Sequence, residues 1–395
     1  MKKSIFPSDH ILELSEIKQI LRNMLPKLES IERNKKKLKV TVMPDFFVDR
    51  IIEVADYSSF VSDTRKKINA GGGSLRGYSS IDIKGGNAVN VAYCLAKLGF
   101  CINLYTIADE IGDSILRSVF SPFNKSVNLY VERGKHGLST VFEFSDPHNA
   151  RSPSNVMVSD VGDNDNFGPE ILESKNHISS LDYSDAVMIT NWASNLRGTD
   201  LLQTVFKNAP HSIHFLDPAD IEKRSFEFIN ILKINSKLID FLSINENEFN
   251  QLIRALQRIF DKKNNNNEWI YNNNTNFKNI DKNSKIILYN AFVTLHLFDS
   301  DSYPQNIDAI CGSVKTLSMY FNLTICLHTT KGSFMCTPHY DVNASSGSED
   351  VDNSSNSDST KNSKNYDAKN VLFVASILPS KISIVSGAGD SWDAG

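Results

Sequence analysis

Short apolar runs that alternate with helical patterns constrain this sequence most, because such alternation leaves few topologies open. Runs typical of buried strands lie at Leu38–Met43, Ala186–Thr190, Ile213–Leu216, Phe241–Ile244 and Leu323–His328. Apolar residues recur at helical spacing over 88–98, 199–207, 246–260 and 307–321. This order predicts an α/β fold in which helices cover a mostly parallel sheet. Ligands of such folds bind beyond the carboxyl ends of the strands.

Other segments depart from this alternation. Residues 54–84 and 129–145 hold short alternating runs between Gly and Ser residues, which predicts a small β-layer that acts as a lid. Residues 262–284 are rich in Asn and Lys, and residues 343–366 in Ser, Asn and Asp. Both have too few apolar residues to offset the entropy of ordering, so we predict disordered insertions. Residues 8–30 predict an amphipathic helix, which makes 1–37 an N-terminal helical extension.

Composition excludes several classes of protein. The 395 residues include 41% hydrophobic and 22% charged residues, which is ordinary for a soluble domain. A net charge of -4 argues against a nucleic-acid partner. No apolar run reaches the length of about 20 residues that a membrane span needs, and the N-terminus lacks the apolar stretch of a signal peptide. We therefore expect a cytoplasmic protein.

The first motif with chemical content reads Gly85-Gly86-Asn87-Ala88-Val89-Asn90-Val91-Ala92 and continues to Leu98-Gly99. A Gly-Gly turn lets a ligand approach the backbone closely at the positive end of a helix. Asn90 falls in the first helical turn, where its amide can bond a ligand hydroxyl. Taken alone, the motif also fits a glycine turn into a buried helix, with Asn90 as a local cap.

The second motif, Ser386-Gly387-Ala388-Gly389-Asp390-Ser391-Trp392-Asp393-Ala394-Gly395, ends the sequence. Its small residues leave backbone N–H groups free to face an anion. Phosphoryl transfer needs such donors, and also a carboxylate that accepts the proton of the attacking hydroxyl. Taken alone, the segment also fits a flexible tail that happens to contain an aspartate.

Together the two motifs are more specific. The first resembles the N-terminal signature of the PfkB (ribokinase-like) sugar kinases, GGxxxNxAxxLxxLG, at every fixed position. The second resembles their C-terminal signature, GAGDxFxxG, with Trp392 in place of Phe. The resemblance covers residues 38–395 and implies a ribokinase-like three-layer α/β sandwich with a small β-lid. It further implies transfer of the ATP γ-phosphoryl group to a hydroxyl of a sugar, sugar-like compound or nucleoside, and it allows a homodimer through the lid.

The resemblance also implies roles for individual residues. Asp390 would be the catalytic base, and the N–H groups of Gly387, Ala388 and Gly389 would stabilise the moving phosphoryl group. The positions that match acceptor-binding residues are Asp49, Gly86, Asn87 and Asn90. Pro44 replaces the usual Gly and Phe47 a frequent Asn, so the contacts to the acceptor are altered.

Three further segments match the nucleotide side. Asn245-Glu246-Asn247-Glu248 resembles the NxxE motif, in which Asn245 and Glu248 organise phosphate and Mg²⁺, with Glu248 acting through water. Thr330 and Gly332 resemble the segment that lies along the ATP phosphates. Asp217 begins a D-P-x-x turn near the phosphates. Each has a plainer interpretation: a solvated helix start, an exposed loop, or a residue that shapes its turn.

Some features leave alternatives open. Ile384 stands where many relatives have a K⁺-binding Asp, which argues against a potassium requirement. A non-catalytic sugar- or nucleotide-binding relative would tolerate Pro44 and Phe47, although it would not need Asp390. A pyrimidine or vitamin kinase of the same superfamily is a third interpretation, which the GGxxxN motif disfavours.

The position of the second motif adds one more expectation. Five residues follow Asp390, where relatives begin a long helix that supplies the N–H groups of the anion site. We therefore expect residues 1–395 alone to be an incomplete kinase that turns over negligibly.

Overall fold

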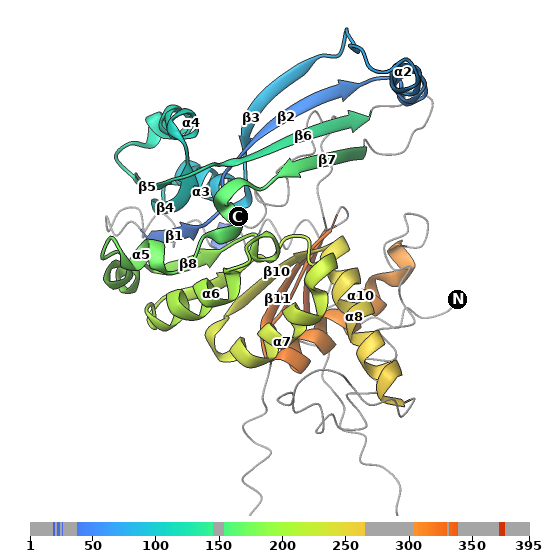
Figure 1. Ribbon diagram of the computed structural model, residues 1–395. Helices are drawn as coiled ribbons and strands as arrows, with labels where there is room; N and C mark the ends of the chain where they lie inside the picture. Colours follow the sequence, from blue (N-terminus) through green and yellow to red (C-terminus); the bar gives the residue numbers. More distant parts are fainter. Residues whose placement is uncertain are drawn as a thin grey trace, which may run out of the picture.

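A nine-stranded sheet forms the centre of the protein (Figure 1). The computed structural model describes residues 38–144, 154–264, 303–329, 332–338 and 371–375, together with positions 19, 22, 23 and 26. The strands are β1 (Lys39–Met43), β4 (Cys101–Ala108), β5 (Val127–Arg133), β8 (Ala186–Ile189), β9 (Ile213–Leu216), β10 (Phe241–Asn245), β11 (Thr324–His328), β12 (Gly332–Cys336) and β13 (Val371–Ala375). Their order is β13-β12-β11-β10-β9-β8-β1-β4-β5. β11 and β12 pair antiparallel, and so do β12 and β13, whereas all other neighbours in this sheet are parallel. The sheet is therefore mostly parallel, as the sequence predicts.

Helices cover both faces of this sheet. One face packs against α6 (Gly198–Lys207), α7 (Ser225–Asn235), α8 (Glu246–Asn264) and α10 (Tyr303–Phe321), and the other against α3 (Asn87–Lys97) and α4 (Glu110–Phe120). Alternation along the strands divides the side chains between the two cores: Val42 of β1 packs with α3, whereas Met43 packs with α6. These three layers confirm the predicted α/β sandwich.

The fold also contains short helical elements, and some of its longer elements were not predicted from the sequence. The short helix α5 spans Glu170–Glu173. Single 3₁₀ turns occur at Ser121–Phe123, Gly162–Asn166, Ile178–Tyr183, Trp192–Ser194, Glu222–Arg224 and Ser236–Leu238. The sequence expectations did not include β4, α4 and α7, although β4 is buried along nearly its whole length.

A second sheet stands apart from the large one (Figure 1). It has the order β3-β2-β6-β7, with β2 at Phe47–Val54, β3 at Ser80–Gly85, β6 at Gly137–Phe144 and β7 at Ser154–Asp160. Helix α2 (Tyr57–Asn69) packs on it through Phe60, whose ring contacts those of Phe142 and Phe144.

The structure corrects the expected limits of this layer. Lid strands were expected within 129–145. β6 lies there, but Val127–Arg133 is β5, which pairs in parallel with β4 at the edge of the large sheet. Residues 54–84 were expected to hold short strands, yet α2 takes up much of that range. The expected N-terminal helix over 8–30 falls outside the described residues except at the four isolated positions, and so do the insertions apart from 262–264, which end α8.

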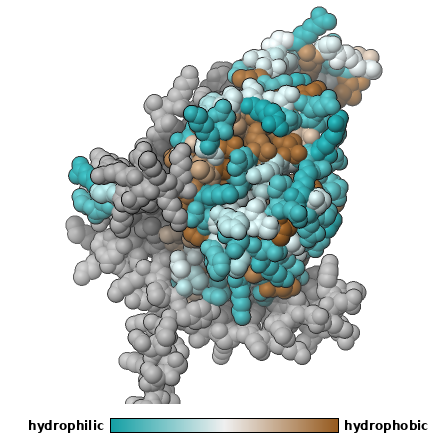
Figure 2. Space-filling model, turned by 90° about the vertical axis from the view of Figure 1, so that its left-hand side faces the viewer, coloured by the Kyte–Doolittle hydropathy of each residue, from teal (hydrophilic) through white to brown (hydrophobic). Residues whose placement is uncertain are grey.

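The surface at the β5 edge of the large sheet is mostly hydrophilic, with apolar groups exposed between the polar ones (Figure 2). Within the described residues, no helix has the length and apolar character that a membrane span requires.

Candidate active site

Polar side chains follow the carboxyl ends of five parallel strands. They are Asp45 after β1, Asn191 after β8, Asp217 after β9, Asn245 at the end of β10 and Thr329 after β11. Because parallel strands place these ends at one edge of the sheet, the five positions share that edge. The sequence predicts a ligand site there.

Asp49 of β2, an expected acceptor-binding residue, lies close enough to Asp45 for the two charges to interact. Its side chain is 6% exposed and sits directly above Gly85, because a Cβ on Gly85 would come within 2.3 Å of the carboxylate. Burial raises the pKa of Asp49, a hydrogen bond with Ser139 opposes that rise, and the nearby carboxylate of Asp45 adds to it. A buried carboxylate with few internal partners is suited to accept hydrogen bonds from hydroxyl groups.

Gly86 places the start of α3 against the chain that leaves β1. Its φ of 90° is in the region that favours glycine. A Cβ on Gly86 would lie 2.8 Å from the carbonyl oxygen of Asp45 and 2.9 Å from the Cα of Phe46. Gly86 is therefore required here by both its backbone angle and its close packing.

Asp45 is a site residue that the sequence reasoning missed. It is 1% exposed, and its carboxylate accepts hydrogen bonds from the backbone N–H groups of Asn87 (2.8 Å) and Ala88 (3.1 Å). It also accepts from Thr190 Oγ1 at 2.8 Å and from Asn191 Nδ2 at 3.2 Å. The available signal was an aspartate two residues after an apolar strand, at the edge where ligands bind.

Asn87 joins the first motif to the turn after β9. Its Nδ2 donates to Asp217 Oδ2 at 3.0 Å. Asp217 is 5% exposed, and its other oxygen accepts from the backbone N–H of Ala219. Two segments separated by 130 positions therefore meet, and both had been singled out from the sequence.

Asn90 occupies the first turn of α3, as expected, and its side chain contacts Lys84. Lys84 Nζ donates to Asn90 Oδ1 and lies over the ring of Tyr93, 4.7 Å from its centroid. Lys84 also lowers the pKa of Asp49, although burial outweighs it. A cation thus accompanies the expected acceptor-binding amide.

The NxxE segment forms a capping box at the start of α8. Asn245 Oδ1 accepts from the N–H groups of Asn247 and Glu248 at 2.9 and 3.0 Å. Glu248 accepts in return from the N–H of Asn245 at 2.9 Å and from its Nδ2 at 2.7 Å. The structure therefore gives both residues a local structural role, which the sequence alone did not reveal.

Glu248 also carries an electrostatic signature. It is 5% exposed, and burial together with the neighbouring charge of Asp217 raises its pKa to about 8. Asp220 contributes a smaller rise. A divalent cation would relieve this repulsion, so the residues fit an indirect contact to Mg²⁺ through water. No group of three or more His, Cys, Asp or Glu within the described ranges is arranged to bind a metal directly.

The other segment expected on the nucleotide side lies where β11 and β12 pair antiparallel. Thr329 Oγ1 donates to the carbonyl oxygen of Gly332 at 2.7 Å and accepts from its N–H at 3.0 Å. Gly332 is thus placed at the carboxyl end of β11. Thr330, the signature residues Gly387, Ala388, Gly389 and Asp390, and Ile384 all lie outside the described residues.

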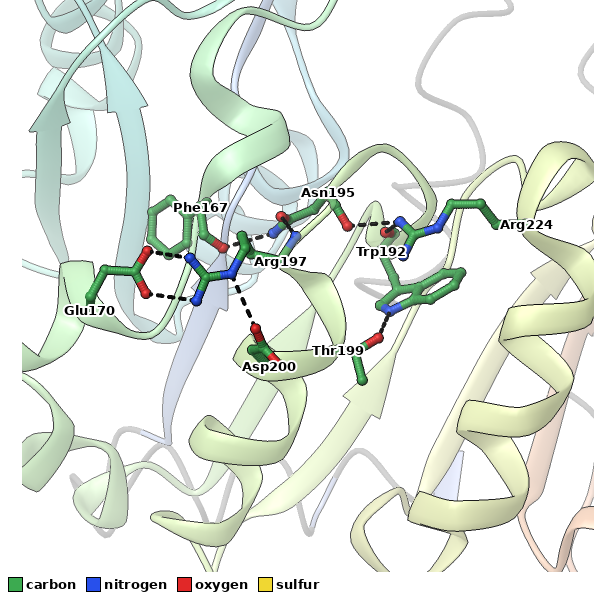
Figure 3. Close-up of polar contacts among 8 residues, drawn as sticks. All are labelled: Phe167, Glu170, Trp192, Asn195, Arg197, Thr199, Asp200 and Arg224. Carbon is green, nitrogen blue, oxygen red and sulfur yellow. Dashed lines mark hydrogen bonds and ion pairs between the residues drawn. The ribbon is translucent and has the colours of Figure 1, made fainter. Parts of the chain in front are cut away.

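The segment after β8 is held by Arg224, as Figure 3 shows. The guanidinium lies 4.1 Å from the centroid of the Trp192 ring, and it donates to the carbonyl oxygens of Trp192, Ala193 and Asn195. Asn195 Nδ2 donates to the carbonyl oxygen of Phe167 at 2.9 Å. These contacts hold residues 192–195 in place after Asn191. Most of this segment therefore has a structural role next to the site.

Comparisons with known proteins agree with this architecture. An adenosine kinase from Sinorhizobium meliloti has a similar structure, with a TM-score of 0.54 and 14% identity, covering 91% of this chain and 85% of that chain. Ribokinases from Giardia lamblia and Arabidopsis thaliana give TM-scores of 0.49 and 0.47 at 14% and 13% identity, covering 76% and 91% of this chain and 73% and 83% of theirs. No family model and no curated protein matches the sequence. The similarity to the adenosine kinase structure shows that the chain has this fold, a ribokinase-like α/β sandwich.

Proposed function

We propose that this protein is an ATP-dependent kinase that phosphorylates a hydroxyl group of a sugar or a sugar-like acceptor, with nucleosides included. The observation that supports this most directly is the 3.0 Å hydrogen bond between Asn87 and Asp217. It joins an acceptor-side motif to a nucleotide-side motif at the edge of the sheet where ligands of this fold class bind. The similarity to an adenosine kinase structure makes nucleosides reasonable candidates beside sugars.

The proposed roles follow from the chemistry of each group. Asp49 accepts hydrogen bonds from acceptor hydroxyls, while Gly86 and Asn90 complete the acceptor side. Asp390 takes the proton of the attacking hydroxyl, and the N–H groups of Gly387, Ala388 and Gly389 stabilise the charge on the phosphoryl group. Thr330 and Gly332 lie along the ATP phosphates.

On the metal side, Asn245, Asp217 and Glu248 would hold Mg²⁺, with Glu248 acting through water. Bound Mg²⁺ would neutralise phosphate charge during transfer. The second sheet excludes water, which would otherwise compete as the acceptor. We propose a cytoplasmic enzyme, with a homodimer through this sheet as one arrangement.

A non-catalytic sugar- or nucleotide-binding relative is the second candidate, and Phe47 favours it. Phe47 lies on the same face of β2 as Asp49 and is 8% exposed, with its ring against Gly137. An aromatic ring therefore replaces a frequent hydrogen-bonding residue beside the acceptor position.

One assay separates the two candidates. The protein is incubated with ATP labelled at the γ-position, Mg²⁺ and a panel that contains ribose, fructose, adenosine and inosine. We expect label in one acceptor, and an Asp49→Asn variant should need a much higher concentration of that acceptor. Saturable binding of a panel member without transfer of label would favour the non-catalytic relative instead.

A further inference from the structure

Asp45 is a buried carboxylate for which the proposed reaction has no direct use. It is 1% exposed, whereas surface aspartates remain in water, so its charge must be compensated inside the protein. Four donors supply that compensation, at distances between 2.8 and 3.2 Å. A buried charge with a complete set of donors fixes the positions of those donors relative to one another.

Two of the donors belong to the first turn of α3. The N–H groups at the start of a helix have no partner within the helix. Gly86 stands at the N-cap position and has no side chain to serve them. Asp45 accepts from both Asn87 and Ala88 and so caps α3 from another segment of the chain.

The other two donors belong to the end of β8. Thr190 donates to one oxygen of Asp45 and Asn191 to the other. Asn191 has a φ of 50°, an uncommon backbone conformation that its bond to Asp45 helps to hold. The ends of β1 and β8 and the start of α3 therefore meet at one carboxylate.

The hydrogen bonds of Asp45 affect both the proposed acceptor side and the proposed nucleotide side of the site. The backbone bond from Asn87 to Asp45 places its side chain, which donates to Asp217 on the nucleotide side. The chain next to Asp45 packs against Gly86, and Gly85 lies beneath the carboxylate of Asp49. A shift of Asp45 would move the acceptor side relative to Asp49.

We infer that Asp45 is a positioning residue, which sets the start of α3 against Asp49 and thereby determines acceptor affinity. This inference rests on the proposed kinase function. Asp45→Asn tests it, because the amide keeps the shape of the side chain but removes its charge and turns an N–H group toward a donor. Asp185→Asn is the matched control: Asp185 accepts from the backbone N–H of Lys39 at 2.8 Å, at the amino ends of β1 and β8, away from the site.

Two measurements on the protein test the positioning role of Asp45. Amide hydrogen exchange should show the Asn87 and Ala88 N–H groups exchanging at least about 10-fold faster in Asp45→Asn, with no change in Asp185→Asn. The KM for the acceptor found in the labelled-ATP assay should rise about 10- to 100-fold in Asp45→Asn. The KM for ATP should rise by a clearly smaller factor, since Asp45 reaches the nucleotide side only through the hydrogen bond from Asn87 to Asp217.

Other outcomes overturn the inference. Unchanged exchange at Asn87 and Ala88 in Asp45→Asn would remove the capping role, and an equal rise of both KM values would reduce Asp45 to a residue of general stability. If the wild-type protein phosphorylates no acceptor, the proposed function fails. The exchange data then still show whether Asp45 holds the start of α3, and the affinity for adenosine or ribose replaces KM as the second readout.

Discussion

Asn87 donates a hydrogen bond of 3.0 Å from its side-chain amide to the carboxylate of Asp217, and so connects the start of α3 with the turn after β9. This bond crosses the edge of the sheet where the acceptor and nucleotide sides meet. The carboxylate of Asp217 is the hydrogen-bond acceptor, and a hydrogen bond to a charged group is stronger than one between neutral groups.

Asn87→Ala should therefore destabilise the protein by about 1–3 kcal/mol, because it leaves Asp217 without one donor. Urea unfolding at pH 7 measures this change in the free energy of unfolding. Asn128→Ala is a suitable control, since Asn128 donates to the neutral side chain of Asn103 at 2.9 Å. An effect of Asn87→Ala no larger than that of the control would mean that the bond to Asp217 contributes little.

Gly86→Ala should destabilise the protein by about 1–3 kcal/mol more than Gly99→Ala. Both glycines have a φ near 90°, in the region that favours glycine, so both substitutions carry a backbone penalty. Only the Cβ on Gly86 meets other atoms, since nothing lies within 4 Å of the corresponding position on Gly99. Thermal unfolding of the two variants side by side isolates the clash, and equal melting temperatures would contradict the close packing.

Glu248→Gln should change how stability depends on pH. The pKa of Glu248 is about 8 in the folded protein and near 4.5 in the unfolded chain, so the folded state holds the proton more tightly. Stability from this group is therefore full below pH 4.5 and is lost as pH rises toward 8. Glutamine does not ionise, and it can also serve in a capping box.

The variant should thus have a stability close to that of the wild type at pH 5 and should gain on it as the pH rises to 8. The gain is a few kcal/mol at most, because one pKa unit corresponds to about 1.4 kcal/mol. Urea unfolding in EDTA at pH 5, 6.5 and 8 measures it. A constant difference between the two proteins across this range would show that Glu248 ionises normally.

Asn90→Ala should raise the KM for the acceptor more than the KM for ATP, because Asn90 lies in the first turn of α3, on the acceptor side. Loss of one hydrogen bond to a ligand predicts a change of about 10-fold. Lys84→Met tests whether the lysine shares this role, as it contacts the same amide oxygen. If Asn90→Ala raises both KM values equally, Asn90 serves the fold and not the acceptor.

The strands that the sequence predicted are those with continuous apolar runs. β1, β8, β9, β10 and β11 are all of this kind, because strands of a parallel sheet are covered on both faces. β4 was not predicted since polar residues interrupt it: Asn103 and Thr106 are both buried, and Asn103 is bonded to Asn128 and Thr41. α7 has buried residues on several sides, so its pattern lacks a clear polar face.

Some residues of the candidate site could likewise be predicted from the sequence, and others could not. Asp49, Gly86 and Asn87 could be found because a short motif contains or directly implies them. Asp45 had only the signal of an aspartate that follows an apolar strand. Its role could not be predicted, because its partners Asn87 and Thr190 lie 42 and 145 positions away and only the fold brings them together. The capping box of Asn245 and Glu248 fits an ordinary helix start, and its burial beside Asp217 depends on how β9 and β10 pair.

The most direct test of the proposed mechanism is the turnover of the Asp390→Asn variant, with labelled ATP and the acceptor that the panel identifies. We predict a variant with the melting temperature and acceptor affinity of the wild type, and a kcat lower by about 10²–10⁴-fold, because the amide cannot accept the proton of the attacking hydroxyl. A variant that transfers phosphate at close to the wild-type rate would contradict the assignment of Asp390 as the base, and with it the proposed mechanism.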